Sequence, residues 1–303
     1  MDAARTSPTD SGRAVQWIPP LPEAPGFDHL VVETPGLRTH VAAIGEGDPA
    51  VLLHGFPHHW WQWHAIAPAI AAHGYRVLCP DLRGAGWTEA DDPRIERETR
   101  LRDLLSLFDV LGIESTHLVS HAMGAITAMQ LTYDHPERVR TAVQLAVWPG
   151  FVKFSPKLFP AFQNLPPYIW HRPGASLRGT FSERYVARPI SEATVDAHLT
   201  PMHRPEIDAA VRRLTRGMVL PEATRIMRGV YRRRRRLTVP TLVVFGRRDY
   251  PTTEELMGRI CRDPERFADR VEFAYVDGAA HFVTDDTPAE IADLSLDWFD
   301  RAA

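Results

Sequence analysis

The sequence predicts an α/β fold built on a mostly parallel central sheet with helices on both faces. Three observations lead to this prediction. Short runs rich in β-branched and apolar residues alternate with helical patterns along most of the chain. Polar or glycine-rich junctions follow several of the predicted strands. The alternation stops once, over a long segment rich in proline, aromatic and arginine residues, and then resumes.

The composition is that of a globular protein with one domain and an insertion, or with two domains. The 303 residues are 44% hydrophobic and 24% charged, which is enough for a large core. The net charge of -3 gives no indication of nucleic-acid binding, and the basic run Arg232–Arg236 is interpreted as a solvated helix end. No run of about 18 apolar residues could span a membrane. Cys79 and Cys261 lie far apart and show neither metal spacing nor a disulfide framework, which favours a reducing, cytoplasmic location.

The predicted elements begin after an irregular N-terminal arm, residues 1–26, which is polar and proline-rich and lacks the apolar stretch of a signal peptide. Pro35-Gly36 is a turn signal, so the first two strands are expected to pair antiparallel. The predicted strands are Leu30–Glu33, Thr39–Ile44, Val51–His54, Arg76–Cys79, Thr116–Ser120, Thr141–Val147, Thr241–Phe245 and Val271–Val276. The predicted helices between them are His64–His73, Arg100–Leu111, Ala125–His135, Thr253–Arg262 and Pro288–Arg301.

Residues 148–237 are predicted to form a helical lid inserted between two strands of the sheet. Helical patterns cover Ser191–His198 and Pro205–Met218, and the strand pattern resumes after Val239-Pro240. Open α/β sheets place their sites at the carboxyl ends of the strands, so the insertion is expected to cover that edge. The core would then comprise residues 27–147 and 238–303.

Five junctions at the ends of predicted strands carry the candidate chemistry. Parallel strands bring these junctions to the same edge of the sheet. The junctions are His54-Gly55-Phe56-Pro57, Asp81-Leu82-Arg83-Gly84-Ala85-Gly86, Ser120-His121-Ala122-Met123-Gly124-Ala125, Gly246-Arg247-Arg248-Asp249 and Asp277-Gly278-Ala279-Ala280-His281-Phe282.

This ordered set resembles the α/β-hydrolase family over nearly the whole chain, apart from the N-terminal arm and much of the lid. In that family the nucleophile sits between small residues at a tight strand-to-helix turn. The third junction fits this pattern except at its centre, where Ala122 has no nucleophilic group. The family order of nucleophile, acid and histidine implies Asp249 as the acid and His281 as the base. The resemblance also implies an oxyanion hole made by the backbone N–H groups of Phe56 and Met123.

Because alanine has no nucleophilic group, a molecule with Ala122 is expected to be nearly inactive. Several interpretations explain why an alanine stands at this position. Asp249, His281 and the His-Gly-Phe-Pro turn are all retained, although a chain that had drifted away from catalysis would not need them. This favours a deliberate substitution that traps a substrate or product. The alternatives are a natural pseudoenzyme that binds a ligand, and a lyase that uses His281 alone.

The local pattern is most similar to epoxide hydrolases, which implies aspartate as the missing nucleophile. Ala125 follows the turn, and the His-Gly-Phe-Pro motif is followed by Trp60-Trp61-Gln62-Trp63. Epoxide hydrolases also use lid tyrosines, whose neutral phenols donate to the epoxide oxygen. Tyr231, in the pair Tyr231-Arg232, matches one of them. Phe159 stands in the expected place of the other, ahead of Phe162-Gln163, and Tyr168 follows closely enough to replace it.

A serine-type hydrolase or acyl-transfer enzyme acting on an ester, thioester or lactone is the main alternative, and haloalkane dehalogenases match less well. The expected ligand is a sizeable apolar small molecule. No cofactor or metal is expected, and a homodimer is left open. The histidines and tryptophans between His58 and His64 are interpreted as packing and pocket wall, because no carboxylate is interleaved among them. The predicted substrate-binding residues are Trp60, Trp148, Phe159, Trp170 and Phe282.

Overall fold

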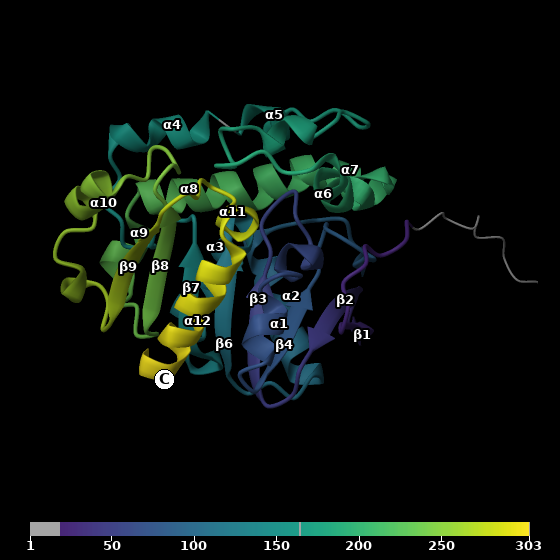
Figure 1. The fold of residues 1–303 in the computed structure, drawn as a ribbon. Coiled ribbons are helices and arrows are strands. Elements are labelled where there is room, and N and C mark those ends of the chain that lie inside the picture. Colours follow the sequence, from purple (N-terminus) through teal and green to yellow (C-terminus); the bar gives the residue numbers. More distant parts are fainter. Residues whose placement is uncertain (1–18, 164, 303) are drawn as a thin grey trace, which may run out of the picture.

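A computed structural model describes residues 19–163 and 165–302 (Figure 1). Residues 1–18 of the predicted N-terminal arm lie outside the described residues. The strands are β1 (Asp28–Thr34), β2 (Leu37–Ile44), β3 (Asp48–Leu53), β4 (Tyr75–Pro80), β5 (Glu89–Ala90), β6 (Thr116–His121), β7 (Val139–Leu145), β8 (Thr241–Gly246) and β9 (Val271–Val276). The helices are α1 (Ala67–Ala71), α2 (Arg97–Val110), α3 (Ala122–Asp134), α4 (Phe159–Phe162), α5 (Pro166–Ile169), α6 (Glu192–Leu199), α7 (Pro205–Leu214), α8 (Leu220–Met227), α9 (Val230–Arg234), α10 (Glu254–Ile260), α11 (Val283–Asp286) and α12 (Pro288–Ala302).

The strands form one mostly parallel sheet, as predicted. Their order is β1-β2-β4-β3-β6-β7-β8-β9, and β5 pairs with β2 at the edge. All pairs from β4 through β9 along this order are parallel. The predicted antiparallel pairing of the first two strands is confirmed, with Thr34 opposite Leu37 across the turn. The two-residue strand β5 was not predicted, because so short a segment carries no periodicity.

Each face of the sheet is covered by helices, and the alternation of side chains along the strands explains why. Val51 and Leu53 of β3 pack with residues of α2, α3 and α10. Ala50 and Leu52, which point to the opposite face, pack with residues of α1 and α12. Because successive strand residues face opposite sides, a strand buried on both faces must be apolar throughout.

The segment between β7 and β8 is helical and lies across one edge of the sheet. Figure 1 shows α4, α5, α6, α7 and α8 above the ends of the strands, on the side where β6 runs into α3. The predicted helix Pro205–Met218 is observed as α7 followed by a π-helical stretch, Thr215–Val219, that leads into α8. We refer to residues 148–237 as the helical insertion. None of the described helices is both long and apolar enough to cross a bilayer.

Candidate active site

Ala122 lies at the sharp turn between β6 and α3 and adopts a strained backbone conformation. Its φ of 46° falls in the left-handed region, which is uncommon for residues other than glycine. Ala146, just after β7, also has a positive φ, of 58°, and both alanines line one cavity, described below. Strain of this kind is concentrated at functional sites.

Close packing around the turn explains the small residues on either side of Ala122. A Cβ on Gly124 would lie 2.3 Å from the carbonyl oxygen of His54, so any larger residue would push α3 away from β3. A Cβ on Gly55 would lie 2.5 Å from Nδ1 of His121. The junctions after β3 and β6 are therefore held in backbone contact.

Asp249 and His281 meet beside Ala122. The imidazole Nδ1 of His281 lies 3.3 Å from both carboxylate oxygens of Asp249. The Asp249 side chain is 9% exposed and that of His281 is 24% exposed, so the carboxylate is sheltered while the ring can be reached from the cavity. An acid that orients a histidine beside the nucleophile position is the arrangement of a catalytic triad.

His121 connects the turn at Ala122 with the loop that carries His281. Its Nε2 lies 2.9 Å from the carbonyl oxygen of His281, and its Nδ1 lies 2.8 Å from Nε2 of Gln62. Burial lowers the pKa of His121 well below its usual value, so the ring is neutral. No role for His121 could be predicted from the sequence, because its partners come from distant segments.

Ala122, Asp249 and His281 line a largely apolar cavity of about 190 Å³ beneath the helical insertion. Phe56 and Met123, the expected oxyanion-hole residues, both line it. Met123 is the second residue of α3, and the first amides of a helix have no acceptor within the helix. The other lining residues are Ile126, Ala146, Val147, Trp148, Ala161, Phe162, Leu165, Tyr168, Tyr185, Val219, Glu222, Ala223, Ile226, Tyr250, Pro251, Thr252 and Phe282.

Two tyrosines of the helical insertion face this cavity. Tyr168 shares a hydrogen bond of 2.9 Å with the hydroxyl of Thr180, and its own hydroxyl interacts with that of Tyr185. The ring of Tyr185 lies 5.6 Å from that of His281 and stacks on Phe282. Burial raises the pKa of both phenols, so both keep their protons at neutral pH. Tyr185 was missed because it stands in no recognisable motif.

The structure does not bring Tyr231 to the cavity, contrary to the sequence prediction. Its hydroxyl donates to Glu222 and lies 3.4 Å from Nη2 of Arg97. Glu222 is fully buried and stands between Tyr231 and the cavity that it lines. The Tyr-Arg motif gives a position along the chain, but the buried pair of Arg97 and Glu222 determines where the phenol points.

Three of the five aromatic residues predicted to bind substrate also lie elsewhere. Trp148 and Phe282 line the cavity. Trp60 is completely buried against Phe27, whereas Phe159 and Trp170 are 55% and 66% exposed. A short helix presents only one side to a cavity, and in α4 the neighbouring Ala161 and Phe162 occupy that side.

Comparison with known proteins agrees with this architecture. Residues 50–294 match the alpha/beta hydrolase family. Epoxide hydrolase 2 of Siraitia grosvenorii is 38% identical over 123 residues, which cover 40% of this chain and 39% of that protein. The soluble epoxide hydrolase of Corynebacterium sp. (strain C12) is 26% identical over 281 residues, which cover 87% of this chain and 94% of that protein. The fold is shared with epoxide hydrolase VrEH1 from Vigna radiata, with a TM-score of 0.71 at 23% identity over 91% of this chain and 98% of that chain.

The family match spans most of the chain, so this protein belongs to the α/β hydrolase family. Within that family it resembles epoxide hydrolases. The chain spans about two fifths of the length of the Siraitia relative that it matches.

Proposed function

We propose that this cavity is an epoxide hydrolase site in which Ala122 removes the covalent step and leaves binding intact. The observation that supports this most is the convergence of four features on one apolar cavity: the turn at Ala122, the Asp249–His281 pair, the oxyanion-hole amides and the two tyrosines. The helical insertion serves as the lid over the cavity. An aspartate in the active form, replaced by alanine in this chain, accounts for all four.

The first step requires a carboxylate at position 122. One carboxylate oxygen attacks an epoxide carbon, the carbon–oxygen bond of the ring breaks, and a hydroxyalkyl ester forms. The alkoxide takes a proton from Tyr168 or Tyr185 as it develops. Because burial raises the pKa of both tyrosines, each offers a neutral O–H donor, which suits this role.

The second step requires His281 and the oxyanion hole. His281, oriented by Asp249, takes a proton from water, and the water oxygen adds to the ester carbonyl carbon. The amides of Phe56 and Met123 stabilise the resulting oxyanion. Its collapse releases the diol and restores the carboxylate, and the proton on His281 returns to the tyrosinate.

The dimensions of the cavity favour a compact substrate. Its volume of about 190 Å³ is slightly larger than the ~150 Å³ apolar cavity that accommodates benzene in an engineered protein. A phenyl- or cyclohexyl-substituted epoxide fits this space better than the sizeable ligand expected from the aromatic residues of the insertion. Trp148, Phe162 and Ile226 supply the apolar walls.

The test is restoration of the nucleophile. With phenyl-substituted epoxides, Ala122→Asp should raise kcat/KM by about 10⁴-fold or more over the unchanged chain, because losing a nucleophile typically costs that much. Ala122→Asn is the matched control: it has nearly the same shape, tolerates the left-handed backbone equally well and provides no carboxylate. In the restored enzyme, replacing Tyr168 or Tyr185 by Phe should lower kcat, whereas Tyr231→Phe should leave the chemical step unchanged.

Isotope labelling identifies the route. In heavy-oxygen water, a single turnover of the Ala122→Asp enzyme should give unlabelled diol and a labelled protein carboxylate. Labelled diol in the first turnover would instead mean that His281 activates water for direct attack, a route that needs no nucleophile. Revival of ester hydrolysis by Ala122→Ser, with Ala122→Asp inert on every epoxide tried, would replace this proposal by a serine hydrolase. Ligand binding with no turnover in any variant would favour a binding protein.

A further inference from the structure

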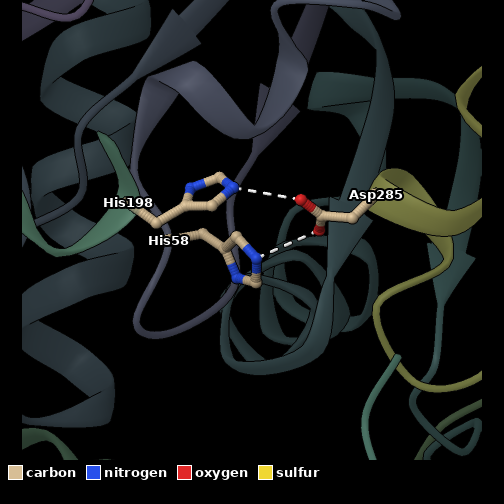
Figure 2. Close-up of side chains that lie close together, drawn as sticks. All are labelled: His58, His198 and Asp285. Carbon is tan, nitrogen blue, oxygen red and sulfur yellow. Dashed lines mark hydrogen bonds and ion pairs between the residues drawn. The ribbon is translucent and has the colours of Figure 1, made fainter. Parts of the chain in front are cut away.

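Three polar side chains outside the substrate cavity converge on one buried point (Figure 2). Nε2 of His58 lies 3.2 Å from one carboxylate oxygen of Asp285, and Nε2 of His198 lies 3.0 Å from the other. One ligand atom from each of the three residues lies within 4.8 Å of the other two. Within residues 19–163 and 165–302, this is the group of three histidine, cysteine or acidic side chains whose ligand atoms lie close enough together to hold a metal ion.

We propose that His58, His198 and Asp285 bind a zinc-class divalent cation. Two imidazoles and one carboxylate are a donor set that suits Zn²⁺ and Co²⁺. With metal–ligand bonds of about 2.0–2.2 Å, tetrahedral geometry places neighbouring ligand atoms about 3.3 Å apart. The observed separations of 3.0 and 3.2 Å, each to a different oxygen of Asp285, are close to this value, so side-chain movements could bring one ion within reach of both imidazoles and the carboxylate.

The surroundings of the cluster favour coordination. Both imidazole side chains are fully buried, and that of Asp285 is 8% exposed. Phe282 packs against the ring of His58 at 4.4 Å, and Phe181 stacks on the ring of His198 at 5.5 Å. An apolar shell limits competition from water and strengthens the attraction between a cation and its ligands.

Among the residues that the structure describes, the ring nitrogens that are not bonded to Asp285 have no partner that would hold the two imidazoles in another orientation. Nδ1 of His58 and Nδ1 of His198 have no hydrogen-bond partner within the described part of the chain. In the metal-free chain each Nε2 donates its proton to Asp285, so an ion that binds Nε2 displaces that proton, and the neutral ring then carries its proton on Nδ1. A protein carboxylate held between two such rings already supplies the anionic ligand.

The three ligands come from three separate segments, which gives the ion a structural role. His58 follows β3, His198 lies on α6 of the helical insertion, and Asp285 lies on α11, four positions after His281. A bound ion would fasten the insertion to the core next to the catalytic loop. His58 was predicted to be packing and pocket wall because no carboxylate is interleaved near it, but the carboxylate comes from 227 positions further along the chain.

The experiment uses the full chain, stripped with a chelator and dialysed against Zn²⁺ or Co²⁺. We expect one ion per chain by elemental analysis and the intense visible bands of tetrahedral cobalt. At an ion concentration about one hundred times Kd, the Tm should rise by about 5 °C. A chain that takes up less than one ion under these conditions, or that shows only the weak spectrum of hydrated cobalt, would overturn the proposal.

Variants assign the binding to this cluster. His58→Gln and His198→Gln should each weaken binding at least 100-fold and remove the Tm shift. His171→Gln is the matched control, because His171 is also a buried insertion histidine bonded to an aspartate, Asp208, but has no second imidazole on that carboxylate. It should retain one ion. Near-UV circular dichroism of each metal-free variant checks the fold, and binding that survives in His198→Gln would refute the assignment.

Discussion

Ala122 has a strained, left-handed backbone at the turn where we propose that the active form carries a nucleophile. A left-handed conformation costs an alanine roughly 1–2 kcal/mol relative to the right-handed one, because its Cβ approaches the following carbonyl oxygen. The close contact between Gly124 and His54 maintains the conformation. The fold around the turn therefore imposes the left-handed conformation, and the residue at position 122 determines how much free energy that conformation costs.

Relief of this strain should be measurable. Ala122→Gly should leave the free energy of unfolding unchanged or raise it by up to about 1 kcal/mol, since glycine accepts a positive φ without cost and only one methyl is lost. Ala125→Gly, in the same helix and completely buried, should lower it by about 1 kcal/mol or more. Urea denaturation of both variants makes the comparison. Equal destabilisation would show that the turn is unstrained in solution.

Some residues of the candidate site could be predicted from the sequence, and others could not. Asp249 and His281 could be located because each directly follows a strand of a parallel sheet, and such positions share one edge. Tyr185 could not, since its approach to His281 depends on how an irregular stretch of the insertion folds back. Glu222 was missed for the same reason, because nothing in its own segment shows that Arg97 lies opposite.

At the scale of elements, a buried ion pair ties the helical insertion to the core helix α2. Nε of Arg97, on α2, lies 2.8 Å from Oε2 of Glu222, on α8. Their side chains are 9% and 0% exposed, and the hydroxyl of Tyr231 completes the group. Removing one member of a buried pair leaves the other charge without compensation, which is costly.

The contribution of this tie can be tested by comparison with an exposed pair. Arg97→Met should lower the free energy of unfolding by about 3 kcal/mol, because the buried Glu222 then loses its nearer cation and keeps the more distant Arg225, at 3.7 Å. Arg178→Met removes an arginine that bonds Glu192 and Asp196 on the surface of the insertion, and it should change stability by less than about 1 kcal/mol. Chemical denaturation monitored by tryptophan fluorescence would measure both. Similar losses in the two variants would contradict a structural role for the buried pair.

The same ion pair shows where element-level prediction from sequence reaches its limit. The helices α2, α6 and α7 could be anticipated from periodicity, with boundaries differing by a few residues. The orientation of Tyr231 on α9 could not, because it depends on a partner more than one hundred positions away. Periodicity reports which face of a helix is apolar, but it does not report which distant polar group that face meets.

For the whole molecule, the alternation of strands and helices was sufficient to predict the architecture. Both faces of the sheet are covered, so the strands appear in the sequence as continuous apolar runs. The strand order was not predicted from these runs, since local pattern carries no information about which strands are neighbours. The family match and the shared fold of VrEH1 agree with the architecture.

The free energy of unfolding of the whole chain should depend on pH because several histidines are buried. His54 is the clearest example of such a histidine. Burial lowers the pKa of His54 from 6.5 to about 4, against the opposing effect of Asp81. Its Nε2 accepts a hydrogen bond from the N–H of Leu82, which requires the neutral ring. In the unfolded chain His54 takes up a proton near pH 6.5, whereas in the folded chain it does so only near pH 4. The contribution of neutral His54 to the free energy of unfolding is therefore complete above pH 6.5 and is lost as the pH falls toward 4.

This loss amounts to roughly 3 kcal/mol for His54. It would be measured as the difference in free energy of unfolding between pH 7.5 and pH 4.5, by urea denaturation. His54→Gln can still accept from Leu82 and does not titrate, so its stability should fall less over the same range. An unchanged pH dependence in that variant would exclude His54 as a contributor.

The helical insertion leaves the sheet after β7 and returns to it at β8, and these two strands are adjacent and parallel, with Ala142 beside Thr241. Its two attachment points therefore belong to neighbouring strands, so the pairing of β7 with β8 can be kept when the segment between them changes in length. Descent with modification can exchange such an insertion while Asp249 and His281 stay in place in the loops that follow β8 and β9. Replacing one contiguous stretch of the gene would then exchange the insertion's share of the cavity wall, Tyr168 and Tyr185 included, while the core keeps Asp249 and His281.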